Sequence, residues 1–269
     1  MDKLDFKLWT LASKGEIVPT RDLLKTPQQI EEIRKSADLN TAVLDHVAEH
    51  IHAGMTTADI DKLVYDFTVS HGGIPAPLNY EGFPKSVCTS LNNVICHGIP
   101  TEDEILIDGD IINVDVSTIL NGYFSDASRM FAIGDLDDRA AKLLRVTKEC
   151  MELGLAAAKP WGHLGDIGYA ITKHAHENGY TVVRDIGGHG VGIEFHEEPF
   201  ISYYTKKGTD MVLVPGMIFT IEPMINEGTP EYFIDEDNGW TIYTDDDMLS
   251  AQMEYMVLIT EDGAQVLSK

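Results

Sequence analysis

The 269-residue chain is poor in cysteine and in long apolar runs. Its three cysteines, Cys88, Cys96 and Cys150, are too few and too scattered for a disulfide framework, which favours a reducing compartment such as the cytoplasm. No segment approaches the ~18 uninterrupted apolar residues of a membrane-spanning helix. The N-terminus also lacks the continuous apolar core of a signal peptide. We therefore expect no contact with a membrane.

Basic residues are also scarce: 20 Lys and Arg oppose 44 Asp and Glu, for a formal net charge of −24. Phosphate backbones are bound by clustered Lys and Arg, so we expect no direct binding to nucleic acid. The acidic excess is compatible with a cationic ligand, such as a free amino terminus or a divalent metal. The simpler explanation is a surface that keeps the protein soluble, and charge alone does not overturn it.

The most informative stretch that is present surrounds Asn121-Gly122, with Asp115 and Asp126 on either side. Alternating apolar and polar residues predict strands, and Asn-Gly is typical of a two-residue hairpin turn. In that register Ser117 pairs with residue 126, so the two aspartates lie diagonally on one face, roughly 7–8 Å apart. A loop one residue longer would separate them onto opposite faces. A solvated strand face would also explain two aspartates.

The order helix, helix, strands is predicted twice along the chain. Residues 26–51 are predicted as a helix that Gly54 ends, followed by a helix from 57 to 72 and strands over 86–131. Residues 136–158 and 164–178 are again helical, and strands follow. An offset of 107 residues places Asp115 on Glu222. We expect one domain, residues 26–269, of two similar halves with the site between them. Residues 1–25 are expected to be a packed or partly ordered N-terminal extension.

Five further residues are candidate ligands or catalytic groups. His97 lies near a predicted strand end, His189 lies in the glycine-rich GGHGVG, and His196 follows seven residues later. Glu222 and Glu254 each lie in an otherwise apolar strand, where a carboxylate is costly unless it is paired or binds a metal. The GGHGVG segment could instead cradle a phosphate, but it lacks the dinucleotide-binding fingerprint. The other histidines have no comparable setting and are assigned to helix surfaces: His46, His50, His52, His71, His163, His174 and His176.

Five segments, in this order, resemble methionine aminopeptidase of type I: NYEGFPKSVCTSLNNVICHGIP, DGDIINVDVSTILNGYFSDASRMF, GGHGVGIEFHEEP, GMIFTIEPM and SAQMEY. The resemblance extends over residues 26–269. It implies the pita-bread fold, an α+β architecture whose two pseudo-symmetric halves curve an antiparallel sheet around a dinuclear metal site and cover it with helices. That expectation agrees with the duplicated order of elements.

The resemblance implies five metal ligands, all present as the required residue type: Asp115, Asp126, His189, Glu222 and Glu254. Asp126 and Glu254 would bridge two divalent ions. A single imidazole among carboxylates suits Mn, Fe, Co or Zn better than Mg or Ca, and the native metal stays open. Two such ions can lower the pKa of a shared water and polarise a scissile carbonyl. Glu222 would also take the proton from that water.

The resemblance further implies two catalytic histidines and a methionine pocket. His97 would lie near the substrate amine and leaving group, and His196 near the peptide carbonyl oxygen, where a donor stabilises the developing charge. A thioether packs favourably on aromatic edges and soft sulfur. The implied pocket residues are Tyr80, Phe83, Cys88, Phe195 and Trp240. His97 and His196 would border it.

The expected activity is removal of the initiator methionine from nascent polypeptides whose second residue is small. The expected partners are nascent-chain N-termini, transient contact with the ribosome is left open, and a monomer is expected on family grounds. A relative of aminopeptidase P or prolidase is an alternative, since these share the fold and the ligands but carry an additional N-terminal domain. A catalytically inactive pita-bread binding protein is another, although such relatives lose ligands that this chain keeps.

Overall fold

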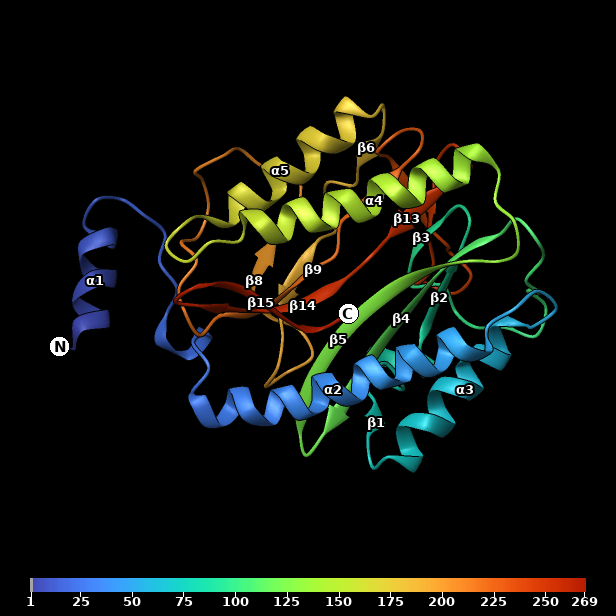
Figure 1. The fold of residues 1–269 in the computed structure, drawn as a ribbon, viewed down its shortest axis with the longest axis horizontal. Helices are drawn as coiled ribbons and strands as arrows, with labels where there is room; N and C mark the ends of the chain where they lie inside the picture. The colour runs from blue at the N-terminus through green and yellow to red at the C-terminus, as the bar shows by residue number, and fades with distance from the viewer. Residues whose placement is uncertain (1) are drawn as a thin grey trace.

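The computed structural model describes residues 2–269, in which two pairs of helices cover antiparallel strands (Figure 1). Helices α4 and α5 lie along one edge of the view in Figure 1 and α2 and α3 along the other, with strands between them. The α-helices of the described residues are α1 Lys3–Ala12, α2 Pro27–His50, α3 Thr57–Ser70, α4 Asp138–Ala157 and α5 Leu164–Glu177. None of these helices is long and apolar enough to cross a membrane.

The strands form four antiparallel sheets, in the orders β1-β4-β2 with β5 beside β4, β13-β10-β6, β11-β12-β3 and β15-β14-β9-β7-β8. The strands of the first half are β1 Ile74–Pro75, β2 Cys88–Leu91, β3 Val94–Cys96, β4 Ile111–Leu120 and β5 Tyr123–Ala132. Those that follow are β6 Thr181–Val182, β7 Gly188–Gly190, β8 Glu197–Ile201, β9 Ile218–Ile221, β10 Met224–Asn226, β11 Tyr232–Ile234, β12 Ile242–Thr244, β13 Ser250–Gln252, β14 Tyr255–Thr260 and β15 Gly263–Ser268.

Local capping chemistry sets the start of α2. The Thr26 hydroxyl accepts a hydrogen bond from the Gln29 amide, and Gln29 Oε1 accepts one from the Thr26 amide, which is the predicted capping box. The predicted end at Gly54 is wrong. The helix stops at His50, because Ile51 is extended and the Gly54 amide donates instead to the Leu106 carbonyl.

The predicted hairpin is confirmed, including its two-residue turn. Asn121 and Gly122 both have positive φ, 53° and 82°, as a type I′ turn requires. Leu120 pairs with Tyr123 and Ser117 with Asp126, so Asp115 lies diagonal to Asp126. The two carboxylates therefore share the face on which the predicted site was placed.

The predicted duplication is also confirmed. When the numbering is shifted by 107 residues, the bounds of α3 coincide with those of α5, and the bounds of β1 with those of β6. The register matches too, because β1 pairs Ile74 with Ile119 of β4 and β6 pairs Thr181 with Asn226 of β10. We call residues 26–132 the N-terminal half and residues 133–269 the C-terminal half.

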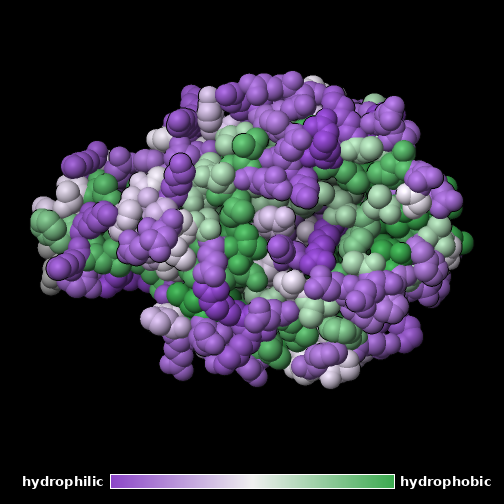
Figure 2. All heavy atoms as spheres, in the orientation of Figure 1, coloured by the Kyte–Doolittle hydropathy of each residue, from purple (hydrophilic) through white to green (hydrophobic). Residues whose placement is uncertain are grey.

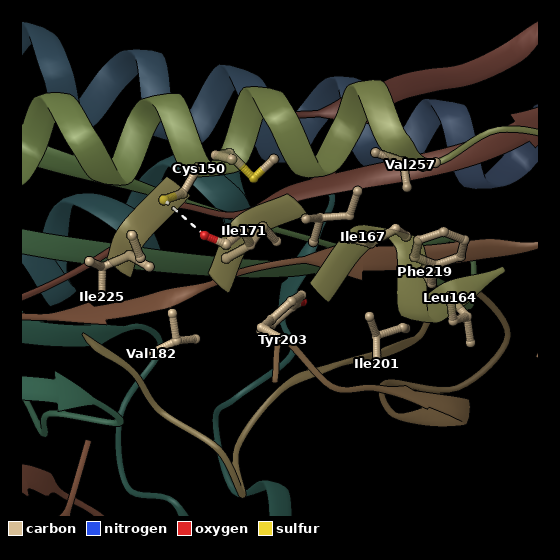
Figure 3. Close-up of a cluster of buried hydrophobic side chains, with 14 of the residues drawn as sticks. Cys150, Leu164, Ile167, Ile171, Val182, Ile201, Tyr203, Phe219, Ile225 and Val257 are labelled. Atoms are coloured by element: carbon tan, nitrogen blue, oxygen red, sulfur yellow. Dashed lines mark hydrogen bonds between the residues drawn. The ribbon is translucent and has the colours of Figure 1, made fainter. Parts of the chain in front are cut away.

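Each helix pair packs its apolar face against the sheet of its own half. In the C-terminal half, α4 and α5 meet closely at Gly154, where a Cβ atom would come within 2.8 Å of Ile171 Cδ1. Figure 3 shows this core, in which the Cys150 thiol points to the Ile171 carbonyl and Phe219 of β9 belongs to the same cluster. A separate cluster packs α2 and α3 against β4 and β5. Hydrophilic side chains dominate the outer faces of the helices (Figure 2).

The first 25 residues include a helix, α1, that the sequence reading did not predict. Asp2 and Asp5 form a capping box at its start, and Leu8 is buried against the core of the C-terminal half. The Lys7 ammonium lies 3.0 Å from the centre of the Trp161 ring. These contacts attach the segment to the C-terminal half, while Figure 1 shows α1 at one end of the molecule.

Candidate active site

A cavity of about 680 Å³ is lined by residues from both halves. The structure brings all twelve predicted site residues to its wall: Tyr80, Phe83, Cys88, His97, Asp115, Asp126, His189, Phe195, His196, Glu222, Trp240 and Glu254. Other residues of the wall were not predicted from sequence, among them Ser117 and the acidic Glu81, Asp185 and Glu198. Predicted residues separated by up to 174 positions in sequence thus share one cavity.

The two halves are joined at the cavity by a backbone bridge. Ser128 of β5 and Glu254, between β13 and β14, exchange amide-to-carbonyl hydrogen bonds of 3.3 and 3.2 Å. The bridge brings Glu254 beside Asp115 and Asp126, whose carboxylates interact with one another and with it. Carboxylates from both halves thereby converge although they lie on different sheets.

His189 of β7 faces these carboxylates. Its Nε2 atom lies 3.6 Å from Asp126 Oδ2 and 3.7 Å from Glu222 Oε1. One ligand atom each from Asp126, His189 and Glu254 lie within 4.8 Å of one another. The Nδ1 atom is 2.9 Å from the Gly190 carbonyl, which only accepts, so Nδ1 carries the hydrogen. The lone pair on Nε2 is then directed at the carboxylates, the arrangement typical of a metal-binding histidine.

Neighbouring side chains hold the carboxylates in place. Ser117 Oγ donates to Asp126 Oδ1 over 2.8 Å. Thr220 Oγ1 donates to Glu222 Oε1 over 2.7 Å, and Gln252 Nε2 donates to Glu222 Oε2 over 3.0 Å. Outer hydrogen bonds of this kind orient metal ligands. None of these three donors was identified from sequence, because each acts through a contact that only the folded register creates.

Two buried carboxylate oxygens of the cluster, Asp115 Oδ1 and Glu254 Oε1, have no hydrogen-bond partner. An unpaired buried charge is costly unless a cation compensates it. Four carboxylates and one imidazole form a donor set that suits divalent transition metals. The residues present therefore fit the predicted metal centre, although their individual roles stay predictions.

The electrostatics of the cluster also require compensation. Burial raises the pKa of Asp115 to about 6, although hydrogen bonding with Glu254 and Asp126 opposes the shift. Burial, together with the neighbouring carboxylate of Asp115, raises the pKa of Glu222 to about 8. The same causes raise the pKa values of Asp126 and Glu254 well above their usual range. Burial lowers the pKa of His189 to about 3. Without a cation Glu222 retains its proton at neutral pH, and a divalent cation would replace that proton.

His97 and His196 approach the cavity from opposite halves. His97 follows β3 with φ +56°, and the next residue must be Gly98, because a Cβ there would lie 1.9 Å from the Thr89 carbonyl oxygen. Burial lowers the pKa of His97 to about 4. His196 Nδ1 lies 3.0 Å from Tyr80 Oη, and desolvation lowers its pKa as well. Both imidazoles are therefore neutral at pH 7.

Aromatic rings form the apolar part of the cavity. Tyr80 and Phe195 meet edge to face with ring centres 4.9 Å apart, and Phe83 and Trp240 do so at 5.3 Å. The buried thiol of Cys88 completes the wall, and its pKa is raised well above the usual range by burial. The structure thus brings together the five residues predicted to bind a methionine side chain.

A buried ion pair holds the loop that carries Phe195 and His196. The Lys25 ammonium, with its side chain 2% exposed, binds Glu197 Oε2. Glu197 Oε1 accepts from the backbone amides of Ile193 and Glu194, over 2.6 and 2.9 Å. Nothing in the local sequence around Lys25 indicated this role, since its partner lies 172 residues further along the chain.

Buried carboxylates, a histidine that faces them and two further neutral imidazoles at one cavity between duplicated halves are typical of metal-dependent hydrolases. The model of "Metallopeptidase family M24" matches residues 31–261. Methionine aminopeptidase A of Synechocystis sp. is 50% identical over 245 residues, which are 91% of this chain and 96% of that protein. The chain therefore belongs to metallopeptidase family M24 and, within it, to the methionine aminopeptidase group.

Solved structures agree with this assignment. The methionine aminopeptidase of Rickettsia prowazekii has a TM-score of 0.89 and 43% identity, and the match covers 91% of this chain and 99% of that one. The prolidase of Pyrococcus furiosus has a TM-score of 0.72 and 25% identity, and the match covers 92% of this chain but 65% of the prolidase. The predicted pita-bread fold is thereby confirmed.

Proposed function

We propose that this protein is a methionine aminopeptidase that uses two divalent cations to hydrolyse the bond after an N-terminal methionine when the second residue is small. The observation that carries the proposal is the convergence of five predicted ligand side chains, two neutral histidines and a group of aromatic rings in one cavity. The similarity to curated methionine aminopeptidases over 91% of the chain supports it independently.

The cations would be held by the five predicted ligands: Asp115, Asp126, His189, Glu222 and Glu254. We propose that the metal would be Mn, Fe, Co or Zn, which suit a set of carboxylates with one imidazole. When bound, divalent cations supply Lewis acidity that polarises a carbonyl and makes water a nucleophile at neutral pH. The hydrogen bonds from Ser117 and Gln252 would keep Asp126 and Glu222 oriented throughout.

Protein groups would move the protons and stabilise charge. The carboxylate of Glu222 accepts the proton of the attacking water and passes it to the leaving amine. In the tautomer proposed here, Tyr80 Oη donates to His196 Nδ1 and the hydrogen of the neutral ring is on Nε2, which can donate to the substrate carbonyl oxygen. His97, neutral and facing the Trp240 ring, contacts the peptide near the scissile bond.

Specificity for methionine would arise from the aromatic wall. Edge-to-face pairs of rings present hydrogen-rich edges and apolar faces, both of which a thioether contacts favourably. The Cys88 thiol adds a polarizable sulfur. The ion pair of Lys25 with Glu197 would hold Phe195 at the wall.

We further propose that residues 26–269 act as one catalytic domain and residues 1–25 as an extension, and that the enzyme acts as a monomer on nascent chains in the cytoplasm. The three cysteines are free and buried, as they would be in a reducing compartment. Transient contact with the ribosome is compatible with this function, but no residue supports it specifically.

A proline-directed peptidase is the second candidate, because prolidases share the fold. The aromatic pocket and the far higher coverage of the Rickettsia enzyme favour methionine. An inactive binding protein is disfavoured because every predicted ligand is present and oriented.

Substrate preference and metal content test the proposal together. The protein is stripped with a chelator, loaded with Mn(II), Fe(II), Co(II) or Zn(II), and offered Met-Ala and Ala-Pro peptides. We expect cleavage of Met-Ala only, with two equivalents of metal bound at the cavity. Failure to cleave Met-Ala with any of the metals would refute the proposal, and cleavage of Ala-Pro alone would select the second candidate.

A further inference from the structure

A second cluster of metal-ligand side chains lies in the last two turns of α2, outside the cavity. His46, Glu49 and His50 stand at positions i, i+3 and i+4, which a helix places on one face. One ligand atom from each lies within 4.8 Å of the other two. None of the three lines the cavity of the candidate active site. Two histidines at i and i+4 are the spacing by which helices of zinc enzymes bind their metal.

The His50 ring is already oriented for ligation. Its Nδ1 atom lies 2.8 Å from the His46 carbonyl oxygen, which can only accept a hydrogen bond. The hydrogen of the neutral ring is therefore on Nδ1, and the lone pair is on the exposed Nε2. A histidine bound to a metal characteristically donates its other nitrogen to a carbonyl or carboxylate in this manner.

The His46 ring is held by an aromatic stack between α2 and α3. It lies on Phe67 with centroids 4.5 Å apart, and Phe67 in turn stacks with His71 at 4.1 Å. His46 and His50 themselves are 4.3 Å apart between ring centres. Partial burial, and then the proximity of His50, lower the pKa of His46, which keeps the ring available as a neutral ligand.

The position at a helix end also favours a cation. The last carbonyls of α2 carry the negative end of the helix dipole, and the only basic group in that turn is His50 itself. The exposed carboxylate of Glu49 adds a full negative charge. Positively charged ligands are therefore attracted to the face on which the two imidazoles lie.

We propose that His46, Glu49 and His50 form a peripheral site for one transition-metal cation of the Zn, Cu, Ni or Co class. Two imidazole nitrogens and a carboxylate make a His₂Glu set, which leaves a coordination position for water. Tetrahedral ligands at 2.0–2.1 Å from zinc are about 3.3 Å apart, so rotation of the exposed Glu49 side chain, with a small tilt of the His50 ring, closes the site. Mg²⁺ and Ca²⁺, which prefer oxygen ligands, are excluded. The inference does not depend on the proposed catalytic function, because the two sites share no residue.

Equilibrium dialysis against micromolar Zn²⁺, with metal content measured by mass spectrometry, tests the proposal on the full chain. The double variant His46→Gln/His50→Gln should bind one equivalent fewer than the wild type. His50→Gln alone should weaken that equivalent at least about tenfold, since even residues that only orient metal ligands change affinity by this much. Glutamine is a good helix former, so α2 should persist. His71→Gln, on the same surface but outside the cluster, should leave the stoichiometry unchanged.

Amide hydrogen exchange locates the bound ion. Zn²⁺ should slow exchange in peptides covering residues 46–54 of the wild type but not of the double variant. Peptides around Asp115 and Glu222 should respond equally in both proteins, and cleavage of Met-Ala at saturating active-site metal should be unchanged. Equal stoichiometry in wild type and double variant, or protection confined to the cavity peptides, would refute the peripheral site.

Discussion

The N-terminal and C-terminal halves share a scaffold and differ in the polar residues that the scaffold carries. Helix α3 and helix α5 occupy equivalent ranges, as do β1 and β6. Asp115 and Glu222, equivalent under the same shift, are both acids at the cavity wall. The strands that hold them differ, because β4 runs unbroken through Asp115 whereas β9 and β10 are interrupted at Glu222.

The strands that pair back onto these, β5 in the N-terminal half and β13 in the C-terminal half, differ more in how they are connected. In the N-terminal half two turn residues join β4 to β5, whereas residues 227–249 join β10 to β13. When the β4-β5 pairing is superimposed on the pairing of β9 and β10 with β13 and β14, Asp126 takes the place of Gln252, and Ser128 takes the place of Glu254. A carboxylate in one half is thus an amide or a hydroxyl in the other. Duplication supplied the frame, and the ligand set is asymmetric within it.

The matched pair Glu222 and Asp115 gives the largest expected effect. Glu222→Gln should lower kcat by about 10²–10⁴-fold, because it removes the proton acceptor as well as a ligand charge. Asp115→Asn should weaken metal binding, so added metal should restore much of its activity. Steady-state kinetics over a metal titration separate the two, and equal rescue of both variants would contradict a special role for Glu222.

The loop held by Lys25 belongs only to the C-terminal half and should respond next. Lys25→Met leaves Glu197 largely buried without its partner and should lower the free energy of unfolding by about 3–5 kcal/mol. It should also lower kcat/KM, because Phe195 and His196 lose their support. Denaturant unfolding and peptide cleavage measure both effects. The double variant Lys25→Met/Glu197→Gln should regain stability, and its failure to do so would contradict the ion-pair explanation.

The stability of the metal-free protein should depend on pH, because buried carboxylates from both halves crowd the cavity. The pKa of Glu222, raised from 4.5 to about 8, means that the metal-free native state holds its proton more tightly than the unfolded chain. Stability is therefore lost as pH rises towards 8. The lowered pKa values of His97 and His189 act oppositely, but only below about 6.5. Between pH 6.5 and 8 the metal-free Tm should fall, and saturating divalent metal should abolish the fall. Parallel profiles with and without metal would contradict this linkage.

The two connections provide the smallest effect. Gly122→Ala places a side chain at φ +82° in a turn that the ladder holds on both sides, so it should cost about 1–2 kcal/mol. Gly239→Ala, at φ +73° in the long connection of the C-terminal half, is the matched control and should cost less, because that loop can adjust. Chemical denaturation compares them, and a larger cost at Gly239 would reverse the expected order.

Local rules were enough to predict the start of α2 and the register of the β4-β5 hairpin. Thr26 and Gln29 cap α2, and Asn121-Gly122 sets the hairpin register, each within a few residues of sequence. Helix α1 was missed because its capping residues, Asp2 and Asp5, precede a short segment whose large apolar residues Phe6 and Trp9 remain exposed. The end of α2 was misplaced because the Gly54 amide donates to the carbonyl of Leu106, a residue distant in sequence.

The site residues also divide into those that local sequence predicted and those that depend on distant contacts. Acids in apolar strands could be identified as candidates, and the family resemblance supplied the complete ligand set. The groups that orient those ligands, such as Gln252 on Glu222, follow from pairing between distant strands and left no local pattern. The grouping of His46 with Glu49 and His50 was visible as spacing, but ring orientation distinguishes it from an ordinary helix surface.

The bridge between Ser128 and Glu254 joins two residues that are each other's symmetry mates, so it lies on the pseudo-twofold axis of the molecule. The N-terminal half contributes two of the five proposed ligands and the C-terminal half three, which means that neither half alone carries the full proposed set. Bound metal would hold the two halves together across the axis. If the chain were divided within residues 133–137, the two fragments would then form a complementation pair. Their reassembly could be measured as cation uptake.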